Sequence, residues 1–148
     1  DGATLCTQTC QRRNMPERTR IVLADDHDAT LERVRLLLCD RFDVVAAVHD
    51  GLSLLDAVTR LKPDLAVIDI AMPGLTGLEV TSELKRRRCP TLILILTVSD
   101  DPDVVREAFA LGVSGYVVKA FMVLELVTAI DQILRGQPFV SPGVCHEA

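Results

Sequence analysis

Charged and hydroxyl side chains directly follow four short apolar runs of this sequence. Asp25 and Asp26 follow the run "RIVLA", and Asp69 ends the run "LAVID". Thr97 closes "TLILILT", and Lys119 closes "GYVVK". A charged group next to buried apolar residues costs free energy unless a nearby partner compensates it. The repeated placement therefore calls for one common explanation.

These side chains could together bind a divalent cation and accept a phosphoryl group. Three close carboxylates repel one another, and Mg²⁺ would relieve that repulsion because it takes carboxylate and carbonyl oxygens as ligands. The ammonium group of Lys119 could neutralise one carboxylate when no cation is bound. Between these positive charges, Asp69 is a candidate nucleophile that forms an acyl phosphate. Thr97 offers a hydroxyl that can hydrogen-bond to the phosphoryl group.

Each residue also has an ordinary structural interpretation when it is taken alone. Asp25 or Asp26 could cap the N-terminus of a helix. Thr97 could be a β-branched strand residue, and Lys119 could be a solvated surface cation. The joint occurrence of these types at successive run ends favours a site.

The spacing of apolar residues predicts the elements that would position this site. The expected strands are residues 20–24, 42–48, 65–69, 91–97 and 115–119. The expected helices are residues 29–40, 51–61, 76–88, 101–112 and 123–136. This alternation predicts an α/β fold with a single five-stranded parallel sheet in the flavodoxin-like order 2-1-3-4-5. Ligands bind such sheets beyond the carboxyl ends of strands 1 and 3, where the polar side chains would gather.

The composition excludes several other classes of protein. The chain has 148 residues, of which 49% are apolar, and this suits one folded domain rather than a disordered chain. Its net charge of −5 argues against a general nucleic-acid binder, and the basic run at 85–88 is expected to be a solvated helix end. No apolar run is long enough to span a bilayer. The five scattered cysteines are expected to be reduced thiols, as in a cytoplasmic protein.

The motifs in combination resemble the receiver domain of two-component response regulators, over about residues 19–141. "VLADDH" is similar to the acidic pair of that family, "DIAMPGLTG" to its phosphoacceptor signature, and "GYVVK" to its lysine motif. The resemblance implies that Asp69 is phosphorylated by a sensor histidine kinase. It further implies that Thr97 and Lys119 contact the phosphoryl group. The protein would then be a signalling switch and not an enzyme, apart from slow autodephosphorylation.

The same resemblance implies a metal site and a switch residue. Mg²⁺ would be held by Asp26, Asp69 and the backbone carbonyl of Ala71, with Asp25 assisting. Tyr116 matches the aromatic switch position, whose ring turns inward when the hydroxyl residue moves toward the phosphoryl group. That movement would change the face made by the fourth helix, the fifth strand and the fifth helix.

The end of the chain is similar to receivers that precede a helix-turn-helix output domain of the LuxR/NarL type. The expected division is a leader at 1–16, the receiver domain at 17–141, and at 142–148 the start of a linker to an output domain that the chain lacks. DNA binding would need that output domain. A homodimer is expected through the face just described or through an apolar patch at Phe121, Met122 and Val123. The alternative for this patch is that it completes the core.

Three positions depart from the common pattern of the family. Ala120 follows the lysine where many receivers have a proline, which leaves the geometry of that peptide bond open. Val98 follows the switch threonine where a smaller residue is usual, so its bulk could narrow access to the phosphoryl group. Ala71 has no polar side chain to position an attacking water. We therefore expect the phosphorylated form to be long-lived.

Three other functions remain as alternatives. A receiver-like interaction module that is never phosphorylated would usually lack one of the acidic, threonine or lysine positions. An aspartate-nucleophile phosphatase would carry a second Asp where this chain has Ala71. A flavin or nucleotide binder would carry a glycine-rich loop after the first strand, and the sequence there is "ADDHDAT".

Overall fold

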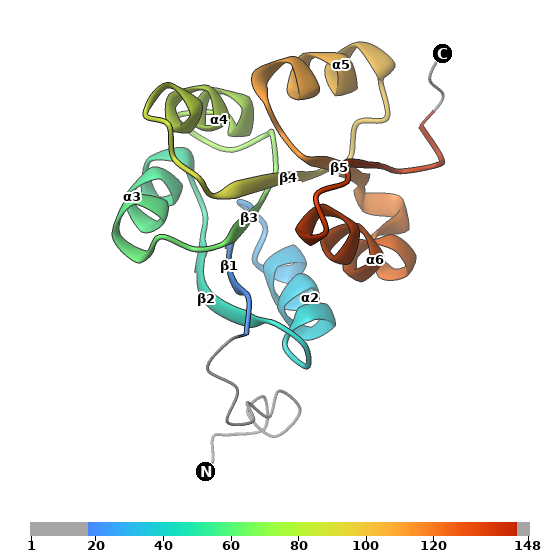
Figure 1. Ribbon diagram of the computed structural model, residues 1–148, viewed down its shortest axis with the longest axis horizontal. Coiled ribbons are helices and arrows are strands. Elements are labelled where there is room, and N and C mark those ends of the chain that lie inside the picture. The colour runs from blue at the N-terminus through green and yellow to red at the C-terminus, as the bar shows by residue number, and fades with distance from the viewer. Residues whose placement is uncertain (1–17, 145–148) are drawn as a thin grey trace.

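The computed structural model describes residues 18–144, which form a parallel sheet with helices on both faces (Figure 1). The strands run in the order β2-β1-β3-β4-β5-β6, and every neighbouring pair is parallel. The strands are β1 (Arg20–Ala24), β2 (Asp43–Val48), β3 (Leu65–Ile68), β4 (Leu92–Thr97), β5 (Gly115–Val118) and β6 (Phe139–Val140). The α/β class and the order of the first five strands are confirmed.

The prediction of a five-stranded sheet is wrong by one strand. Among the described residues the sheet has six strands, because β6 pairs in parallel with β5. Its two residues lie between Pro138 and Pro142 in a segment without apolar alternation, which the sequence indicates only as the end of the domain and a linker. The open edge of β5 supplies the partner that makes this short segment a strand.

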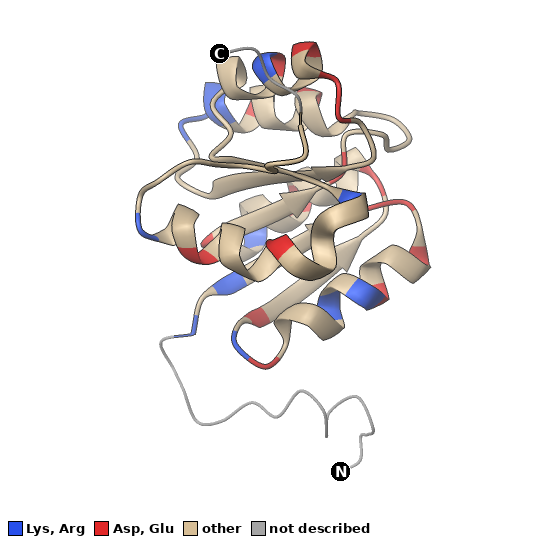
Figure 2. Cartoon of the chain, turned by 90° about the vertical axis from the view of Figure 1, so that its right-hand side faces the viewer, with Lys and Arg blue, Asp and Glu red and all other residues tan. Residues whose placement is uncertain are grey.

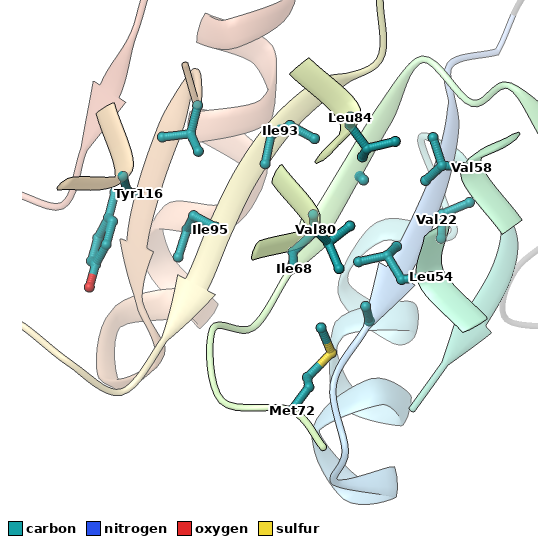
Figure 3. Packing of buried hydrophobic residues seen from close by; sticks show 14 of the residues in the cluster. Val22, Leu54, Val58, Ile68, Met72, Val80, Leu84, Ile93, Ile95 and Tyr116 are labelled. Carbon is teal, nitrogen blue, oxygen red and sulfur yellow. The ribbon is translucent and has the colours of Figure 1, made fainter. Parts of the chain in front are cut away.

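Within residues 18–144, five helices and one short 3₁₀ helix connect the strands. They are α2 (Asp28–Leu38), α3 (Gly51–Leu61), α4 (Gly77–Arg86), α5 (Pro102–Leu111), η1 (Lys119–Phe121) and α6 (Met122–Leu134). Buried residues of α3, α4 and α5 belong to one hydrophobic cluster, and those of α2 and α6 belong to a second cluster on the opposite face of the sheet. Figure 3 shows the first cluster, in which Val80 and Leu84 of α4 lie over the strands.

Local sequence signals define where the helices begin and end. Thr76 and Glu79 form a capping box at α4, in which each side chain accepts the backbone N–H of the other residue. Asp101 caps α5 and is followed by Pro102 at the first helical position. Gly112 ends α5 with a φ of 106°, a left-handed conformation that glycine adopts without strain.

The basic run at 85–88 lies at the end of α4 and just beyond it. Arg86 and Arg87 both donate to Glu83, at 2.5 and 2.7 Å. These hydrogen bonds lower the pKa of Glu83 to about 2. The prediction of a solvated helix end is confirmed for this run.

Two further expectations concern the cysteines and membranes. Cys39 is disulfide-bonded and Cys89 is free, so the prediction of reduced thiols is wrong for Cys39. The other three cysteines and the expected leader lie outside the described residues. Within residues 18–144, every helix is too short or too polar to cross a membrane.

Candidate functional site

Asp25, Asp69 and Lys119 come together at the carboxyl edge of the sheet. The Lys119 Nζ atom lies 2.5 Å from Asp25 Oδ2 and 3.0 Å from Asp69 Oδ2. The backbone N–H of Asp69 donates to the Ala24 carbonyl at 3.0 Å, and this hydrogen bond holds the ends of β1 and β3 side by side. Acidic residues colour the loops at this edge in Figure 2. The predicted convergence of these three residues is confirmed by their contacts.

The alternation of side chains along the strands explains this convergence. Leu23, Val67 and Val117 all point into the cluster under α2 and α6. Side chains two residues apart share a face of a strand. Asp25, Asp69 and Lys119 each lie two positions after one of these residues. Their side chains are therefore on the same face of the sheet, just beyond its apolar core.

Asp25 and Asp69 are buried and Lys119 is mostly buried, so their charges must compensate one another for the folded protein to be stable. The side chains of Asp25 and Asp69 are 4% and 5% exposed, and that of Lys119 is 15% exposed. Burial alone lowers the pKa of Lys119, but its hydrogen bonds to Asp25 and Asp69 outweigh that effect and raise the pKa above its usual value. Lys119 is therefore a fixed cation between two buried carboxylates.

Asp26 and His27 form the outer, more exposed part of the site. The His27 Nδ1 atom lies 3.0 Å from Asp26 Oδ1 and 3.2 Å from Asp25 Oδ1. The backbone N–H of His27 donates to Asp25 Oδ1 at 2.9 Å. His27 itself is the N-cap residue of α2, so neither aspartate takes the capping role that was the alternative for the pair. The sequence alone did not predict a role for His27. The only signal for its contact with both carboxylates is that it directly follows Asp25 and Asp26 in the sequence.

The donor atoms of this edge suit a hard divalent cation. Asp25, Asp26 and His27 offer ligand atoms that all lie within 4.8 Å of one another. Asp69 is not part of that group of three, and it joins the site through the shared contact with Lys119. Carboxylate oxygens are the ligands that Mg²⁺ prefers, so the residues present fit this ion.

The loop after Asp69 holds the carboxylate by backbone contacts. The N–H of Ala71 donates to Asp69 Oδ1 at 3.3 Å, while Lys119 occupies Oδ2. Gly77 packs directly against the backbone of Asp69, and a Cβ at position 77 would lie 2.3 Å from the Asp69 carbonyl oxygen. Only glycine permits this approach of α4 to the end of β3.

Thr97 lies on β4 at the same edge, whereas Tyr116 lies further back on β5, one residue after its start. Thr97 is buried at the end of β4 and pairs with Val118. Tyr116 is 0% exposed, lies beside Ile95, and donates its hydroxyl to the Ser99 carbonyl at 2.9 Å (Figure 3). Burial of the phenol raises its pKa above 10.0. The ring of Tyr116 is therefore buried in this structure, and its role as a switch residue stays a prediction.

The departures from the family pattern are resolved in part. No peptide bond within residues 18–144 is cis, so the bond between Lys119 and Ala120 is trans. Val98 is 76% exposed at the beginning of the loop after β4. Its effect on access to Asp69 stays a prediction.

The predicted apolar patch is wrong in one of its three residues. Met122 is only 4% exposed, whereas Phe121 and Val123 are 37% and 58% exposed. The first residue of α6 is Met122, and this places it on the same helical stripe as Leu126. Leu124, which the sequence did not single out, is the most exposed large apolar residue of this helix at 83%.

The chain is similar in sequence to a known protein family and to several known proteins. The family model of the response regulator receiver domain matches residues 21–131. The transcriptional regulatory protein DegU of Brevibacillus brevis is 33% identical over 129 residues, which are 86% of this chain and 55% of that protein. The response regulator GacA of Pseudomonas aeruginosa is 30% identical over 130 residues, which are 86% of this chain and 61% of that protein. The chain therefore spans little more than half the length of these relatives.

A solved structure gives the same result for the fold. The crystal structure of a two-component response regulator of the LuxR family from Aurantimonas sp. SI85-9A1 superposes with a TM-score of 0.81. It is 34% identical, and the match covers 86% of this chain and 93% of that one. The resemblance to receivers of LuxR/NarL-type regulators is confirmed. With its acidic edge, bridging lysine and flavodoxin-like sheet, the chain belongs to the response regulator receiver domain family.

Proposed function

We propose that this receiver is a phosphoacceptor switch in which Asp69 takes a phosphoryl group from a phosphohistidine of a sensor histidine kinase. The observation that carries the proposal is the position of Lys119 between Asp25 and Asp69. Such a lysine compensates the buried carboxylates at rest and lies close enough to contact a group bonded to Asp69. A structural ion pair alone would need only one of these carboxylates.

The proposed transfer takes place at the carboxylate of Asp69. One carboxylate oxygen forms the new P–O bond while the P–N bond of the donor histidine breaks, and the imidazole leaves with the bonding electron pair. Lys119 and the hydroxyl of Thr97 then neutralise and hydrogen-bond the phosphoryl oxygens. Mg²⁺, held by Asp25, Asp26, Asp69 and the Ala71 carbonyl, would supply further charge neutralisation when bound.

The signal would pass from the site to the face made by α5, β5 and α6. Thr97 closes β4, the strand between Asp69 and β5, and Tyr116 lies in β5 itself. A shift of Thr97 toward the phosphoryl group changes the space available to the ring of Tyr116. The two ring positions then form a bistable element that the charge at Asp69 biases.

The role of the whole protein is proposed from its relatives. DegU is described as a transcriptional regulatory protein and GacA as a response regulator, and both extend well beyond the matched region. We infer that this receiver regulates transcription in the cytoplasm through an output domain that binds DNA. Residues 17–141 would be the receiver and 142–148 the start of the linker. A dimer would form through the α5–β5–α6 face or through Phe121 and Val123.

Two alternatives are weaker on the observed geometry. A module that is never phosphorylated would have no need to keep two carboxylates and a lysine buried at one point. A phosphatase of the aspartate-nucleophile class needs a general acid two residues after the nucleophile, and Ala71 supplies none. We therefore expect slow autodephosphorylation and no turnover of an external substrate.

Acetyl phosphate with Mg²⁺ and intact-mass spectrometry tests the proposal. The wild type is expected to gain one phosphoryl group, and Asp69→Asn is expected to gain none. Asp56→Asn is the matched control, because Asp56 lies on α3 away from the site and forms an ion pair with Arg60. An equal adduct on wild type and Asp69→Asn would assign the group to another residue. No adduct on any of the three proteins would favour the unphosphorylated module.

A further inference from the structure

The chain after α6 returns to the sheet and attaches to β5. Phe139 pairs with Gly115 and Val140 with Tyr116, and the N–H of Ser141 donates to the Tyr116 carbonyl at 2.9 Å. We call residues 139–144 the β5 strap. It covers the outer edge of β5, one border of the face that is proposed to carry the signal.

Ser141 fastens the β5 strap by its side chain as well as its backbone. Its hydroxyl oxygen accepts the Val118 N–H at 2.9 Å and donates to Glu125 Oε1 at 2.5 Å. Ser141 is 0% exposed, so its hydrogen bond with Val118 is buried, whereas the one with Glu125 is only partly buried. A buried backbone donor that loses its acceptor is costly. Val118 is the residue directly before Lys119, so this fastening lies next to the site.

Apolar contacts hold the far end of the β5 strap. Val144 is buried in the same hydrophobic cluster as Tyr116, and Val140 packs against that cluster. Gly143 lies against the ring of Phe121, where a Cβ would come within 2.4 Å of its Cε2 atom. Phe121 therefore serves to cover this segment, in addition to any role at the surface.

We propose that the β5 strap holds the ring of Tyr116 inward and the end of β5 in place, so that attachment of residues 139–144 and the state of the Asp69 site are energetically coupled. The strap contacts β5 from Gly115 to Val118, which includes Tyr116 and ends one residue before Lys119. The second half of this statement rests on the proposed function. Coupling of this kind is reciprocal, so phosphorylation that favours the inward ring also favours an attached strap.

The chain contains one Tyr and no Trp, which gives the proposal a direct readout. Tyrosine fluorescence and its quenching by acrylamide report on Tyr116 alone. In Ser141→Ala we expect the ratio of attached to detached strap to fall about fivefold, the effect of one lost buried hydrogen bond, and quenching to increase. Val144→Asp should increase quenching further, because it places a charge in the apolar cluster. Amide hydrogen exchange of Val118 should speed up in both variants.

Two controls isolate the strap from general destabilisation. Ser82→Ala makes the same substitution on the exposed side of α4, and Leu52→Asp places an acid on an exposed position of α3. Both should keep the quenching of the wild type. Far-UV circular dichroism and thermal unfolding verify that each variant is folded. If Val144→Asp does not fold, the proposal is judged on Ser141→Ala alone. Quenching of Ser141→Ala equal to that of the controls overturns the proposal.

Phosphoryl uptake from acetyl phosphate separates this proposal from the proposed function. We expect slower uptake in Ser141→Ala than in Ser82→Ala, together with the change in quenching. If quenching changes but uptake does not, the strap holds the ring and the coupling to the site is refuted. If even the wild type takes no phosphoryl group, the proposed function fails, and the fluorescence still decides whether the strap holds Tyr116.

Discussion

Replacing Lys119 by methionine tests how the buried carboxylates are compensated. Lys119→Met keeps the length of the side chain and removes the only cation that the structure places within 4 Å of both Asp25 and Asp69, as far as residues 18–144 are concerned. Both carboxylates are buried and would lose this shared cation. Removing one partner of a buried ion pair costs about 3–5 kcal/mol. We expect that loss in the free energy of unfolding at pH 7.5 without Mg²⁺.

Mg²⁺ should restore part of the loss, because it binds the same carboxylates. A ligand that binds only the folded state at 100 times its dissociation constant stabilises it by about 2.7 kcal/mol. Since the variant has no lysine to compete with the ion, we expect Mg²⁺ to stabilise Lys119→Met more than the wild type. Urea unfolding followed by circular dichroism, with and without MgCl₂, measures both effects.

Lys85→Met is the matched control for this experiment. Lys85 lies in the last turn of α4, so its replacement should cost no more than about 1 kcal/mol. If Lys119→Met is no less stable than Lys85→Met, the lysine does not compensate the carboxylates and the charge argument is wrong. Equal stabilisation of wild type and Lys119→Met by Mg²⁺ would refute the shared site.

Four further predictions follow from the same structure. Gly77→Ala should lower the free energy of unfolding by about 1–3 kcal/mol and slow phosphoryl uptake, because its Cβ would press on the Asp69 carbonyl; unchanged uptake would contradict this. Thr76→Ala should cost about 0.5–2 kcal/mol in urea unfolding by removing the capping box, with uptake preserved. The phenol of Tyr116 should ionise above pH 10.0, as measured by tyrosinate absorbance. Because folding raises this pKa, the stability that the phenol contributes is present below the ordinary phenol pKa and is lost as the pH rises through the raised pKa. Ionisation at the ordinary phenol pKa would disprove the burial of the phenol. Since Ala71 cannot position water, the phosphoryl label should outlast many seconds after acetyl phosphate is removed, and Ala71→Glu should shorten that lifetime.

The central part of the site could be predicted because it follows from strand periodicity. Each functional residue ends a run whose alternate residues face the α2 and α6 cluster, so Asp25, Asp69 and Lys119 had to meet if the sheet had the predicted order. Right-handed parallel connections leave little freedom in that order. The side chain of Lys119 is long enough to reach both carboxylates, so its hydrogen bonds with Asp25 and Asp69 follow.

The parts that could not be predicted depend on tertiary contacts without a local signal. The strand character of Phe139 and Val140 comes from the free edge of β5, and nothing in "QPFVSP" specifies it. The contact of Ser141 with Val118 joins residues 23 positions apart. By contrast, the burial of Met122 was available from the sequence, because it lies four residues before Leu126 on the buried stripe of α6.

The cysteine prediction failed for a related reason. Scattered positions and an odd count gave no pairing pattern, and composition alone favoured free thiols. Cys39 at the end of α2 is nevertheless disulfide-bonded. Spacing along the chain does not reveal which cysteines approach each other in space.

Chemical trapping of the phosphorylated residue tests the central claim most directly. Borohydride reduces an aspartyl phosphate to homoserine, and peptide mass spectrometry then locates the reduced residue after treatment with acetyl phosphate and Mg²⁺. We expect homoserine at position 69 in the wild type and in Asp56→Asn, and at no position in Asp69→Asn. Homoserine at another aspartate, or none in a protein that carries the phosphoryl adduct, would contradict the assignment of Asp69 as the acceptor.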